Sequence, residues 1–548
     1  MTKEAILKIS NLTVSLPERA ERPFAVEDVS FEVYPGEILC IVGESGSGKS
    51  MSSNAVMGLL PKPFVYISQG EIMFEGRDIS KISDREMQAI RGSKIGMIFQ
   101  EPMTALNPVM RVNKQLQEVF SSHHLKLSKA EIKTKIIEML DDVGLPDPEI
   151  IGNSYPFELS GGQRQRVMIA MALALQPKIL IADEPTTALD VTTQAQILKL
   201  IAELQETRDM GVIFITHDFG VVAEIADRVI VMQMGKIVEQ GTAEQILNRP
   251  EHPYTRKLIA TVPHLGAQKK EPVTSDIVVS VKGLNKIYGS ETTGLFGKKG
   301  RVVHASRDVD LEIRKGETLG LVGESGSGKS TVGRCIIRLH DSNSGIIDFE
   351  GTDILKLSNS EMMPFRKHIQ MIFQDPYASL NPRRKIGDII TEGPTIHGIP
   401  KAVSWKRAEE LLEIVGLSKI ALKRYPHEFS GGQRQRIGIA RALAMDPKLL
   451  IADEAVSALD VSVQSQVLDL LDEIKTEMDL AMLFVTHDLR VAAQVCDKIA
   501  VMRFGEIVEY GNTYDVFHNP QHDYTKSLLE AVPGKAWKVP DLSGLEIA

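Results

Sequence analysis

The sequence is poor in cysteine, in aromatic residues and in long apolar segments. Among its 548 residues there are three cysteines, Cys40, Cys335 and Cys496, whose wide spacing fits neither a disulfide framework nor a metal-binding cluster. Aromatic residues make up 5% of the chain, and no stretch approaches the roughly 18 apolar residues that cross a membrane. We therefore expect three buried, apolar thiols and no membrane-spanning helix.

Basic residues are fewer than acidic residues. The chain has 63 Lys and Arg against 72 Asp and Glu, which gives a formal net charge of −9. Nucleic-acid-binding proteins usually carry a basic footprint, so the overall charge gives no reason to expect nucleic acid as a partner. The first ten residues, MTKEAILKIS, lack the apolar core of a signal peptide. We expect a cytosolic protein that serves a membrane, if at all, through partners.

The chain carries one set of motifs twice. The octet GESGSGKS occurs at residues 43–50 and again at residues 323–330, 280 residues later. Four further pairs, IFQ-[ED]-P, [LF]SGGQRQR, IADE and THD, recur at offsets of 274 or 270 residues. A nearly constant offset over several motifs indicates gene duplication. We predict two domains, residues 1–262 and 277–548, joined by a polar linker at residues 263–276 that contains proline and glycine.

Each half has the pattern of an α/β fold. Short apolar runs without polar alternation are typical of parallel strands that are covered on both faces. They occur at residues 38–42, 179–182 and 212–215, and again at 319–322, 449–452 and 482–485. Amphipathic stretches between them, such as 130–143 and 192–206, predict helices. The region between the glutamine motif and SGGQ is mostly helical and predicts a separate lobe.

Both octets fit the phosphate-loop pattern G-x-x-x-x-G-K-[ST], and each follows a predicted strand. Glycines there allow backbone N–H groups to surround phosphate oxygens, and the following helix adds its positive end. The lysine should reach the β- and γ-phosphates, and the serine hydroxyl should bind Mg²⁺. The predicted phosphate-binding residues are Gly43, Gly46, Gly48, Lys49, Ser50 and Met51, and Gly323, Gly326, Gly328, Lys329, Ser330 and Thr331. A glycine turn capped by serine would not explain the lysine in both copies.

The IADE motif supplies two carboxylates in each half. Asp183 and Asp453 end a predicted strand, where each can orient Mg²⁺ or its waters. Glu184 and Glu454 follow directly and could polarise the attacking water. His217 and His487 come after another apolar strand and could hydrogen-bond the γ-phosphate and this water. Alone, IADE could be a core strand before a helix cap, and a lone histidine is usually structural, but the same order in both halves favours catalysis.

The SGGQ motif offers a second anion site in each half. A serine and two glycines at a predicted helix start provide a hydroxyl and free backbone donors. Since each half already has a phosphate loop, two anion sites per half suggest that each half completes the nucleotide site of the other. The residues are Ser160, Gly161, Gly162 and Gln163, and Ser430, Gly431, Gly432 and Gln433.

Together, GESGSGKS, IFQ-[ED]-P, [LF]SGGQ, IADE, ALD and THD resemble the ATP-binding subunits of ABC transporters over nearly the whole chain. The resemblance implies, in each half, a RecA-like parallel sheet, an antiparallel β subdomain and a helical signature lobe. It also implies two ATP sites formed head to tail. One would join 43–50, Gln100, Asp183, Glu184 and His217 to 430–433 and Asp460, and the other would join 323–331, Gln374, Asp453, Glu454 and His487 to 160–163 and Asp190. Gln100 and Gln374 would bind Mg²⁺ and sense the membrane subunits.

The resemblance can be narrowed to one subfamily. TALNP and SLNP, ALDVT and ALDVS, and the tails HPYTRKLIATVP and HDYTKSLLEAVP are similar to the dipeptide, oligopeptide and nickel importer ATPases. Most of those ATPases are separate subunits. A single chain that contains both halves resembles the ATPases of the glutathione importer and of the microcin C or oligopeptide importer. The implied partners are two permease subunits and an extracytoplasmic solute-binding protein, at the cytoplasmic face of the bacterial inner membrane. Some relatives have an iron–sulfur cysteine cluster near the C-terminus, which this chain lacks, so we expect ATP and Mg²⁺ only.

The halves also differ around the nucleotide. Met51 stands where the second half has the hydroxyl of Thr331. Tyr288 could stack on adenine, whereas the first half has Leu16 at the matching position and Phe24 as a substitute. No catalytic carboxylate or histidine is missing from either half, so the motifs leave open whether the two sites bind ATP equally well.

Two other functions fit parts of the pattern. A soluble tandem ATPase that acts on ribosomes or DNA usually has a long helical linker, a coiled coil or zinc-binding cysteines, and this chain has none of them. A fused sugar-importer ATPase typically has one degenerate site and lacks the HPYT tail. The intact motifs in both halves and the two tails favour the peptide-type importer.

Overall fold

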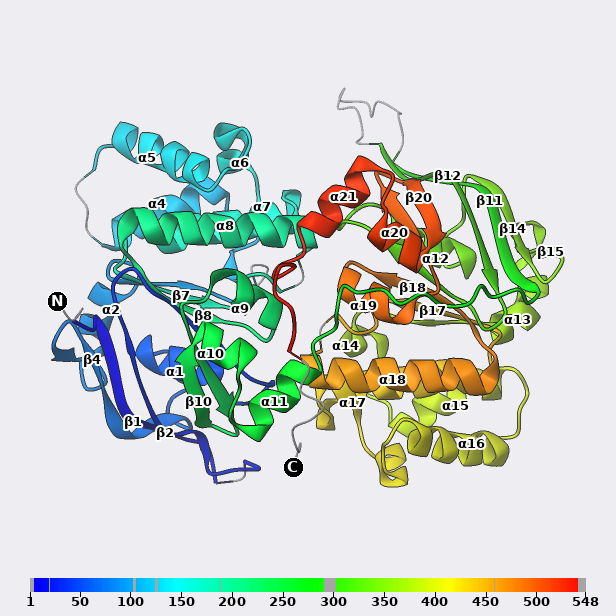
Figure 1. Ribbon diagram of the computed structural model, residues 1–548, viewed down its shortest axis with the longest axis horizontal. Coiled ribbons are helices and arrows are strands. Elements are labelled where there is room, and N and C mark those ends of the chain that lie inside the picture. The colour runs from blue at the N-terminus through cyan, green and yellow to red at the C-terminus, as the bar shows by residue number, and fades with distance from the viewer. Residues whose placement is uncertain are drawn as a thin grey trace. The chain divides into compact units, whose positions relative to one another are not determined.

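The computed structural model describes residues 4–18, 20–101, 105–123, 127–187, 189–289, 302–457 and 459–540. The chain forms two compact units (Figure 1). The first contains residues 1–189, 193–262 and 533–548, and the second contains residues 190–192 and 263–532.

A six-stranded sheet lies at the centre of the first unit. Its strand order is β10-β9-β3-β8-β7-β6, from β3 (Ile38–Val42), β6 (Ile95–Ile98), β7 (Ile179–Asp183), β8 (Gly211–Ile215), β9 (Arg228–Gln233) and β10 (Lys236–Thr242). The strands run parallel except for β10, which pairs antiparallel with β9 at the edge. All residues of β3, β7 and β8 are buried, as expected of strands covered on both faces. The predicted parallel sheet is confirmed.

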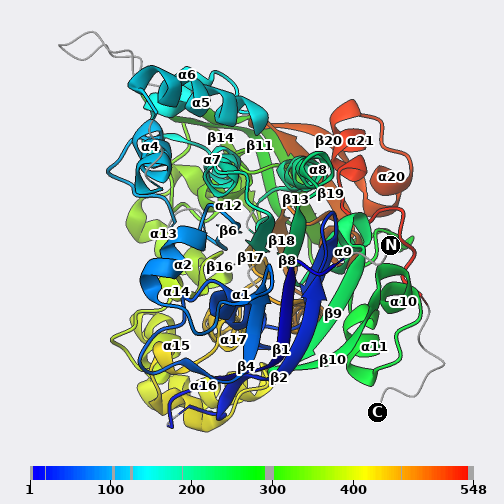
Figure 2. The same cartoon turned by 90° about the vertical axis from the view of Figure 1, so that its left-hand side faces the viewer.

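A second, antiparallel sheet packs against the first. It has the order β2-β1-β4-β5, from β1 (Leu7–Ser15), β2 (Phe24–Val33), β4 (Tyr66–Phe74) and β5 (Arg77–Asp78). Leu7 pairs with Val33 on one side and with Phe74 on the other. Apolar residues of β1 and β2 belong to the same core cluster as residues of β7 and β8, so one core joins both sheets. Figure 2 shows β1, β2 and β4 of the antiparallel sheet in blue.

Helices cover the sheets of the first unit and form a separate lobe, visible above the sheets in Figure 1. The lobe contains α4 (Val112–Ser122), α5 (Lys129–Asp142) and α6 (Pro148–Asn153). A capping box between Ser128 and Glu131 starts α5, because each side chain bonds the backbone N–H of the other residue. The remaining helices are α1 (Lys49–Val56), α2 (Asp84–Ile90), η1 (Pro156–Glu158), α7 (Gly161–Leu173), α8 (Val191–Arg208), α9 (Phe219–Ile225), α10 (Ala243–Asn248) and α11 (Pro253–Ala260).

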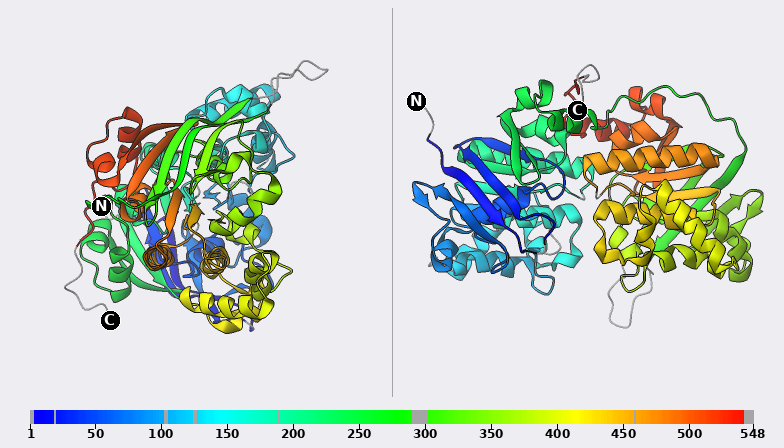
Figure 3. Two further views of the ribbon diagram at one scale, coloured as in Figure 1. Left: turned by 90° about the vertical axis from the view of Figure 1, so that its right-hand side faces the viewer. Right: turned by 90° about the horizontal axis from the view of Figure 1, so that it is seen from below.

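The second unit repeats this architecture. Its sheets have the orders β12-β11-β14-β15 and β16-β17-β18-β13-β19-β20, and Figure 3 shows the antiparallel sheet in green and the helical lobe in yellow. The strands are β11 (Ile277–Tyr288), β12 (Val303–Arg314), β13 (Thr318–Val322), β14 (Ser344–Phe349), β15 (Thr352–Asp353), β16 (Ile369–Ile372), β17 (Leu449–Asp453), β18 (Ala481–Thr486), β19 (Lys498–Arg503) and β20 (Glu506–Asn512). The helices are α12 (Lys329–Ile336), η2 (Ile354–Lys356), α13 (Asn359–His368), α14 (Pro376–Ser379), α15 (Ile386–Ile396), α16 (Lys401–Ile414), η3 (Lys419–Lys423), η4 (Pro426–Glu428), α17 (Gly431–Leu443), α18 (Val461–Met478), α19 (Leu489–Val495), α20 (Thr513–His518) and α21 (Asp523–Glu530).

All three cysteines are buried, Cys40 in the first unit and Cys335 and Cys496 in the second. Burial raises the pKa of Cys335 to about 11 and that of Cys496 to about 12, and it also raises the pKa of Cys40. These thiols therefore stay protonated and unreactive at neutral pH. None of the helices in the described part of the chain is both long and apolar enough to cross a membrane.

Two chain segments that follow the repeated tails make defined contacts. In the second unit, Lys270 bonds the backbone oxygen of Val495 at 3.1 Å and pairs with Asp497 at 3.2 Å. In the first unit, Gly534 donates its N–H to Glu224 at 3.1 Å, and the indole N–H of Trp537 bonds Asn248 at 3.2 Å. The described C-terminal residues are therefore part of the first unit's fold.

Replacing Trp537 by alanine should destabilise the first unit. The half-buried indole loses its packing and its hydrogen bond to Asn248, and we expect a loss of about 1–3 kcal/mol in the free energy of unfolding. Scanning calorimetry of the full chain measures the shift. Lys535→Ala, at an exposed position of the same segment, is the matched control and should leave the transition unchanged. Equal transitions in both variants would contradict the packing role of Trp537.

Candidate nucleotide-binding sites

The first phosphate loop runs from the end of β3 into α1 and passes very close to neighbouring backbone. Gly43 and Gly48 have φ values of 148° and 105°. A Cβ atom on Gly43 would lie 2.2 Å from the backbone oxygen of Met232, and one on Gly48 would lie 2.6 Å from that of Ala25. Both positions therefore require glycine, for lack of space and for backbone conformation. Gly323 and Gly328 repeat this geometry, with Cβ approaches of 2.2 and 1.9 Å.

The loop lysines are held by the loop itself. The Lys49 ammonium donates to the backbone oxygens of Gly43 and Glu44 at 2.7 and 2.9 Å. Lys329 makes the same two contacts at 2.8 Å each, and burial lowers its pKa. Each ammonium group is thus buried against the loop whose N–H groups would surround an anion, where a phosphate would supply its counter-charge.

The loop serines meet the predicted metal-binding aspartates. Ser50 donates to Asp183 at 3.0 Å, and Ser330 donates to Asp453 at 2.7 Å. Burial raises the pKa of Asp183 to about 6 and also raises that of Asp453. The Oδ2 atom of Asp453 is buried without a hydrogen-bond partner among the described residues. Hydroxyl and carboxylate oxygens are ligands that Mg²⁺ prefers, so this donor set fits the ion.

Next to each aspartate, the glutamate lies in a hydrogen-bond network. Glu184 accepts bonds from Gln100 at 2.8 Å and Thr187 at 3.1 Å, and His217 Nδ1 lies 3.4 Å from it. Burial acts to raise the pKa of Glu184, but the bond to His217 and the charges of His217 and Lys49 together lower it to about 2. The pKa of His217 is raised by the same contact, although burial opposes this. The glutamate is therefore ionised at neutral pH.

The second half contains the same glutamate network. Gln374 donates to Glu454 at 2.6 Å, and His487 Nδ1 lies 3.3 Å from it. The pKa of Glu454 is lowered and that of His487 is raised, again against the effect of burial. Glu184 and Glu454 also share left-handed backbone, with φ values of 46° and 48°. Non-glycine residues rarely adopt this conformation, and such strain is common at functional sites.

The SGGQ segments start helices α7 and α17. Ser160 accepts a bond from the Gln163 N–H, and Gln163 accepts one from the Ser160 N–H, while Ser430 and Gln433 form the same capping box. These bonds are made inside the segment, and both serines are exposed. Gly161 and Gly431 occupy the first position of each helix. Gly162 and Gly432 permit close packing, since Cβ atoms there would lie 2.7 Å from Thr193 and 2.5 Å from Val463.

The remaining predicted ligands lie around these elements. Gly46 and Gly326, in the loops, face open space. Asp190 accepts a bond from Thr192 at 2.8 Å, and Asp460 caps α18 by accepting from the Val463 N–H at 3.1 Å. Met51 packs on the core cluster of the first unit, and Thr331 is half-buried in α12. Tyr288, at the end of β11, lies beneath the Lys286 ammonium at 5.0 Å.

The two halves also differ beside the predicted metal site, at a position that lies outside the motifs. Arg334 of α12 lies 3.7 Å from Asp453 as an ion pair, whereas the residue 280 positions earlier is Asn54. The second predicted metal site therefore has a cation beside its carboxylate, which the first lacks. Aligning the two loop helices residue by residue would have shown the substitution.

The chain is similar in sequence to known transporter proteins. The ABC transporter family model matches residues 26–187 and 306–457, and the model of the oligopeptide/dipeptide transporter C-terminal region matches residues 238–285 and 508–542. The glutathione import ATP-binding protein GsiA of Salmonella choleraesuis is 49% identical over 96% of this chain and 89% of its own length. Its namesake from Escherichia coli O6:H1 is 48% identical over the same shares. A solved bacterial ABC transporter cassette, described as dimeric, aligns with 43% of this chain and 98% of its own at 30% identity, with a TM-score of 0.39.

The chain belongs to the ABC transporter family, because the family model covers more than half of it in two copies. It is a nucleotide-binding protein and an ATP-hydrolysing subunit of an ABC transporter. The resemblance drawn from the motifs is thereby confirmed, and so is the predicted fold of two ABC ATPase domains.

Asp183→Asn should make the nucleotide-free protein more stable at pH 8. The folded-state pKa of about 6 lies above the ordinary value of 3.8, so the folded wild type binds the extra proton between these values and loses stability as pH rises through them. The amide avoids this loss, which is worth about 1–3 kcal/mol. Calorimetry at pH 4 and pH 8 should show a small difference at pH 4 and the full gain at pH 8.

The control for this variant is Asp141→Asn, at an exposed position in α5, which should show no such pH-dependent gain. A wild type that is more stable than Asp183→Asn at pH 8 would contradict the placement of Asp183 as a desolvated carboxylate.

Proposed function

We propose that the chain powers a bacterial peptide-type importer with two ATP sites, each built from the phosphate loop of one half and the SGGQ segment of the other. By their motifs the two ATPase domains are residues 1–262 and 277–548, with residues 263–276 as the linker, although residues 533–540 of the second pack in the first unit. The observation that carries the proposal is the repeated cluster in which a loop lysine, a serine–aspartate pair and a glutamate–histidine pair converge. Ser160 and Ser430 are exposed, and the capping-box bonds of both SGGQ segments lie within their own helices, which leaves other N–H groups of the first helical turn for a nucleotide.

In the proposed first site, Lys49 and the loop N–H groups bind the β- and γ-phosphates. Ser50, Asp183 and Gln100 would hold Mg²⁺, which when bound neutralises charge on the phosphate oxygens. The ionised Glu184, fixed by Thr187 and His217, accepts a hydrogen bond from the attacking water. The second site uses Lys329, Ser330, Asp453, Gln374, Glu454 and His487 in the same roles.

The charge pattern around the glutamate supports this assignment. Asp183 and Glu184 are adjacent in the chain, yet the pKa of the first is raised and that of the second is lowered. Acidic residues whose pKa values are shifted in opposite directions are a feature of catalytic sites. Here Asp183 would bind the ion and Glu184 would contact the attacking water. A phosphate placed beside Lys49 would bring negative charge to Glu184 and raise its pKa, which makes it a stronger hydrogen-bond acceptor.

Replacing Glu184 and Glu454 together by glutamine should leave ATP binding intact and lower turnover at least 100-fold, because the amide is a much weaker acceptor for the water. Phosphate release measures turnover, and nucleotide retained after rapid gel filtration measures binding. Glu203→Gln, an exposed change in α8, is the control. Undiminished phosphate release from the double variant would refute the role of these glutamates.

Cross-paired variants test whether the sites are shared between the halves. Ser430→Arg blocks one SGGQ segment by bulk and charge. If the sites are shared, adding Glu184→Gln damages the same site again and leaves one equivalent of ATP hydrolysed per chain in a single-turnover assay. Adding Glu454→Gln instead damages both sites and leaves none. The reverse outcome would show that each half uses its own SGGQ segment.

We further propose that the cargo is a small peptide or a peptide-like solute such as glutathione, and that the partners are two permease subunits and an extracytoplasmic solute-binding protein. The match to the oligopeptide/dipeptide transporter C-terminal region and the names of the relatives support this. The protein would then lie at the cytoplasmic face of the inner membrane, bound through the permeases. Membrane vesicles that contain the permeases and the chain should accumulate labelled glutathione or dipeptides only with ATP and the binding protein present. ATP-driven movement in the opposite direction would contradict an importer.

A further inference from the structure

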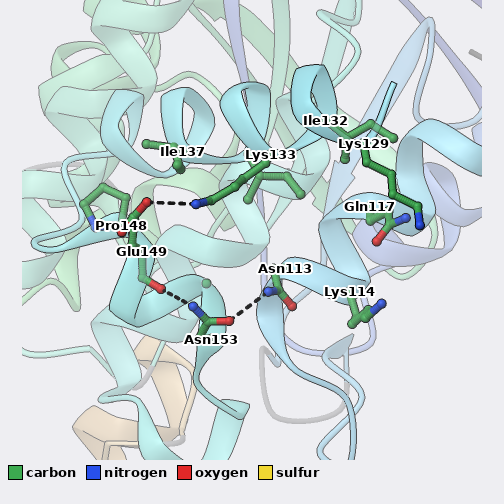
Figure 4. A pocket seen from close by; sticks show the side chains of 12 residues that line it. Asn113, Lys114, Gln117, Lys129, Ile132, Lys133, Ile137, Pro148, Glu149 and Asn153 are labelled. Atoms are coloured by element: carbon green, nitrogen blue, oxygen red, sulfur yellow. Dashed lines mark hydrogen bonds and ion pairs between the residues drawn. The ribbon is translucent and has the colours of Figure 1, made fainter. Parts of the chain in front are cut away.

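The helical lobe of the first half contains a pocket of about 320 Å³ between α4, α5 and α6 (Figure 4). Ile132, Ile136 and Ile137 of α5, together with Pro148 of α6, supply its apolar wall. Asn113 of α4 bonds Asn153 of α6 at 3.1 Å across one side. None of the residues proposed to bind nucleotide or Mg²⁺ lines this pocket, so it is separate from the ATP sites.

In the second half, an indole and a leucine side chain occupy the space that corresponds to this pocket. Lys133 and Trp405 are both the fifth residue of a 14-residue helix. Asn113 and Gly387 are both the second residue of an 11-residue helix.

The indole of Trp405 lies directly on Gly387, because a Cβ atom there would be 2.3 Å from the ring. Both halves contain a Tyr-Pro pair before the SGGQ segment, at residues 155–156 and 425–426. Three residues before this pair, the second half has Leu422, which is buried in its core, and the first half has Gly152. Where its pocket lies, the first half thus lacks the indole and the isobutyl group that the second half has. The space fits a planar aromatic ring, since its counterpart is filled by one.

Charge at the pocket favours an anion. Lys114, Lys129 and Lys133 line it, and Glu149 is its one acidic residue. Glu149 pairs with Lys133 at 3.1 Å. The ammonium groups of Lys114 and Lys129 have no ion-pair partner among the described residues, so the lining carries a net positive charge. An anionic group at the rim and an apolar ring inside would satisfy both parts of the pocket.

We propose that this pocket binds a small planar aromatic carboxylate, with the ring against Ile137 and Pro148 and the carboxylate near Lys114 and Lys129. The site belongs to the first half only, because Trp405 and Leu422 fill the second. It would give the importer's motor subunit a ligand site that is distinct in place and in chemistry from its ATP sites.

Indole-3-acetate is a suitable probe, because it combines the indole of Trp405 with a carboxylate. Isothermal titration of the full chain, saturated with MgADP to occupy the nucleotide sites, should show one saturable site. Neutral indole should bind at least tenfold more weakly. The variant Lys114→Gln/Lys129→Gln should weaken binding of indole-3-acetate about tenfold and leave binding of indole unchanged.

A filled variant tests the location. Asn113→Gly/Lys133→Trp/Gly152→Leu copies the second half into the first and should abolish binding, while the calorimetric midpoint stays equal or rises because a void is filled. Lys133→Trp alone is a milder form, expected to weaken binding at least tenfold if the triple variant misfolds. Absence of saturable binding to the wild type, or unchanged affinity in a folded filled variant, would overturn the proposal. Neither result depends on ATP hydrolysis, so both are separate from the tests of the proposed function.

Discussion

The close approach of each phosphate loop to neighbouring backbone is the constraint on which the rest of the site depends. Gly43 lies so near the carbonyl of Met232 that a single methyl group would collide with it at 2.2 Å. This contact ties the loop to the end of β9, and the matching contact of Gly48 with Ala25 ties it to β2. Because both sheets fix the loop, Lys49 and Ser50 start α1 at the point where Asp183 ends β7. Pre-positioned groups of this kind need no rearrangement when charge develops.

Burial and hydrogen bonding shift the pKa values of the adjacent carboxylates Asp183 and Glu184 in opposite directions. Asp183 lies at the end of a buried strand with one hydroxyl partner, so desolvation dominates and raises its pKa. Glu184 turns out of the strand in left-handed backbone toward Gln100, Thr187 and His217, and these partners outweigh its burial. The strained turn after β7 therefore decides which carboxylate faces the predicted ion and which faces the histidine.

Much of the fold followed from the sequence, because apolar runs such as residues 38–42 and 212–215 are short, unbroken and repeated. The motifs assigned Ser50 and Asp183 to one ion, and Glu184 and His217 to one water, and the structure places the members of each pair in contact. Other features depend on side chains at positions that no motif marks. The contacts of Arg334 with Asp453, of Trp537 with Asn248 and of Trp405 with Gly387 join segments distant in sequence. Such contacts become visible only when the backbone is known.

Because the linker joins both halves in one chain, the cell makes them in equal copy number. Residues 263–276 join two domains whose lobes, loop helices and metal-site neighbours differ, and Lys270 fixes this segment to Asp497. Two dissimilar cassettes made as separate chains would compete with pairs of identical ones and would depend on matched expression. Covalent linkage gives equal copy number and a high effective concentration of one half for the other. Each chain therefore contains one helical lobe with the pocket and one in which Trp405 and Leu422 occupy the corresponding space.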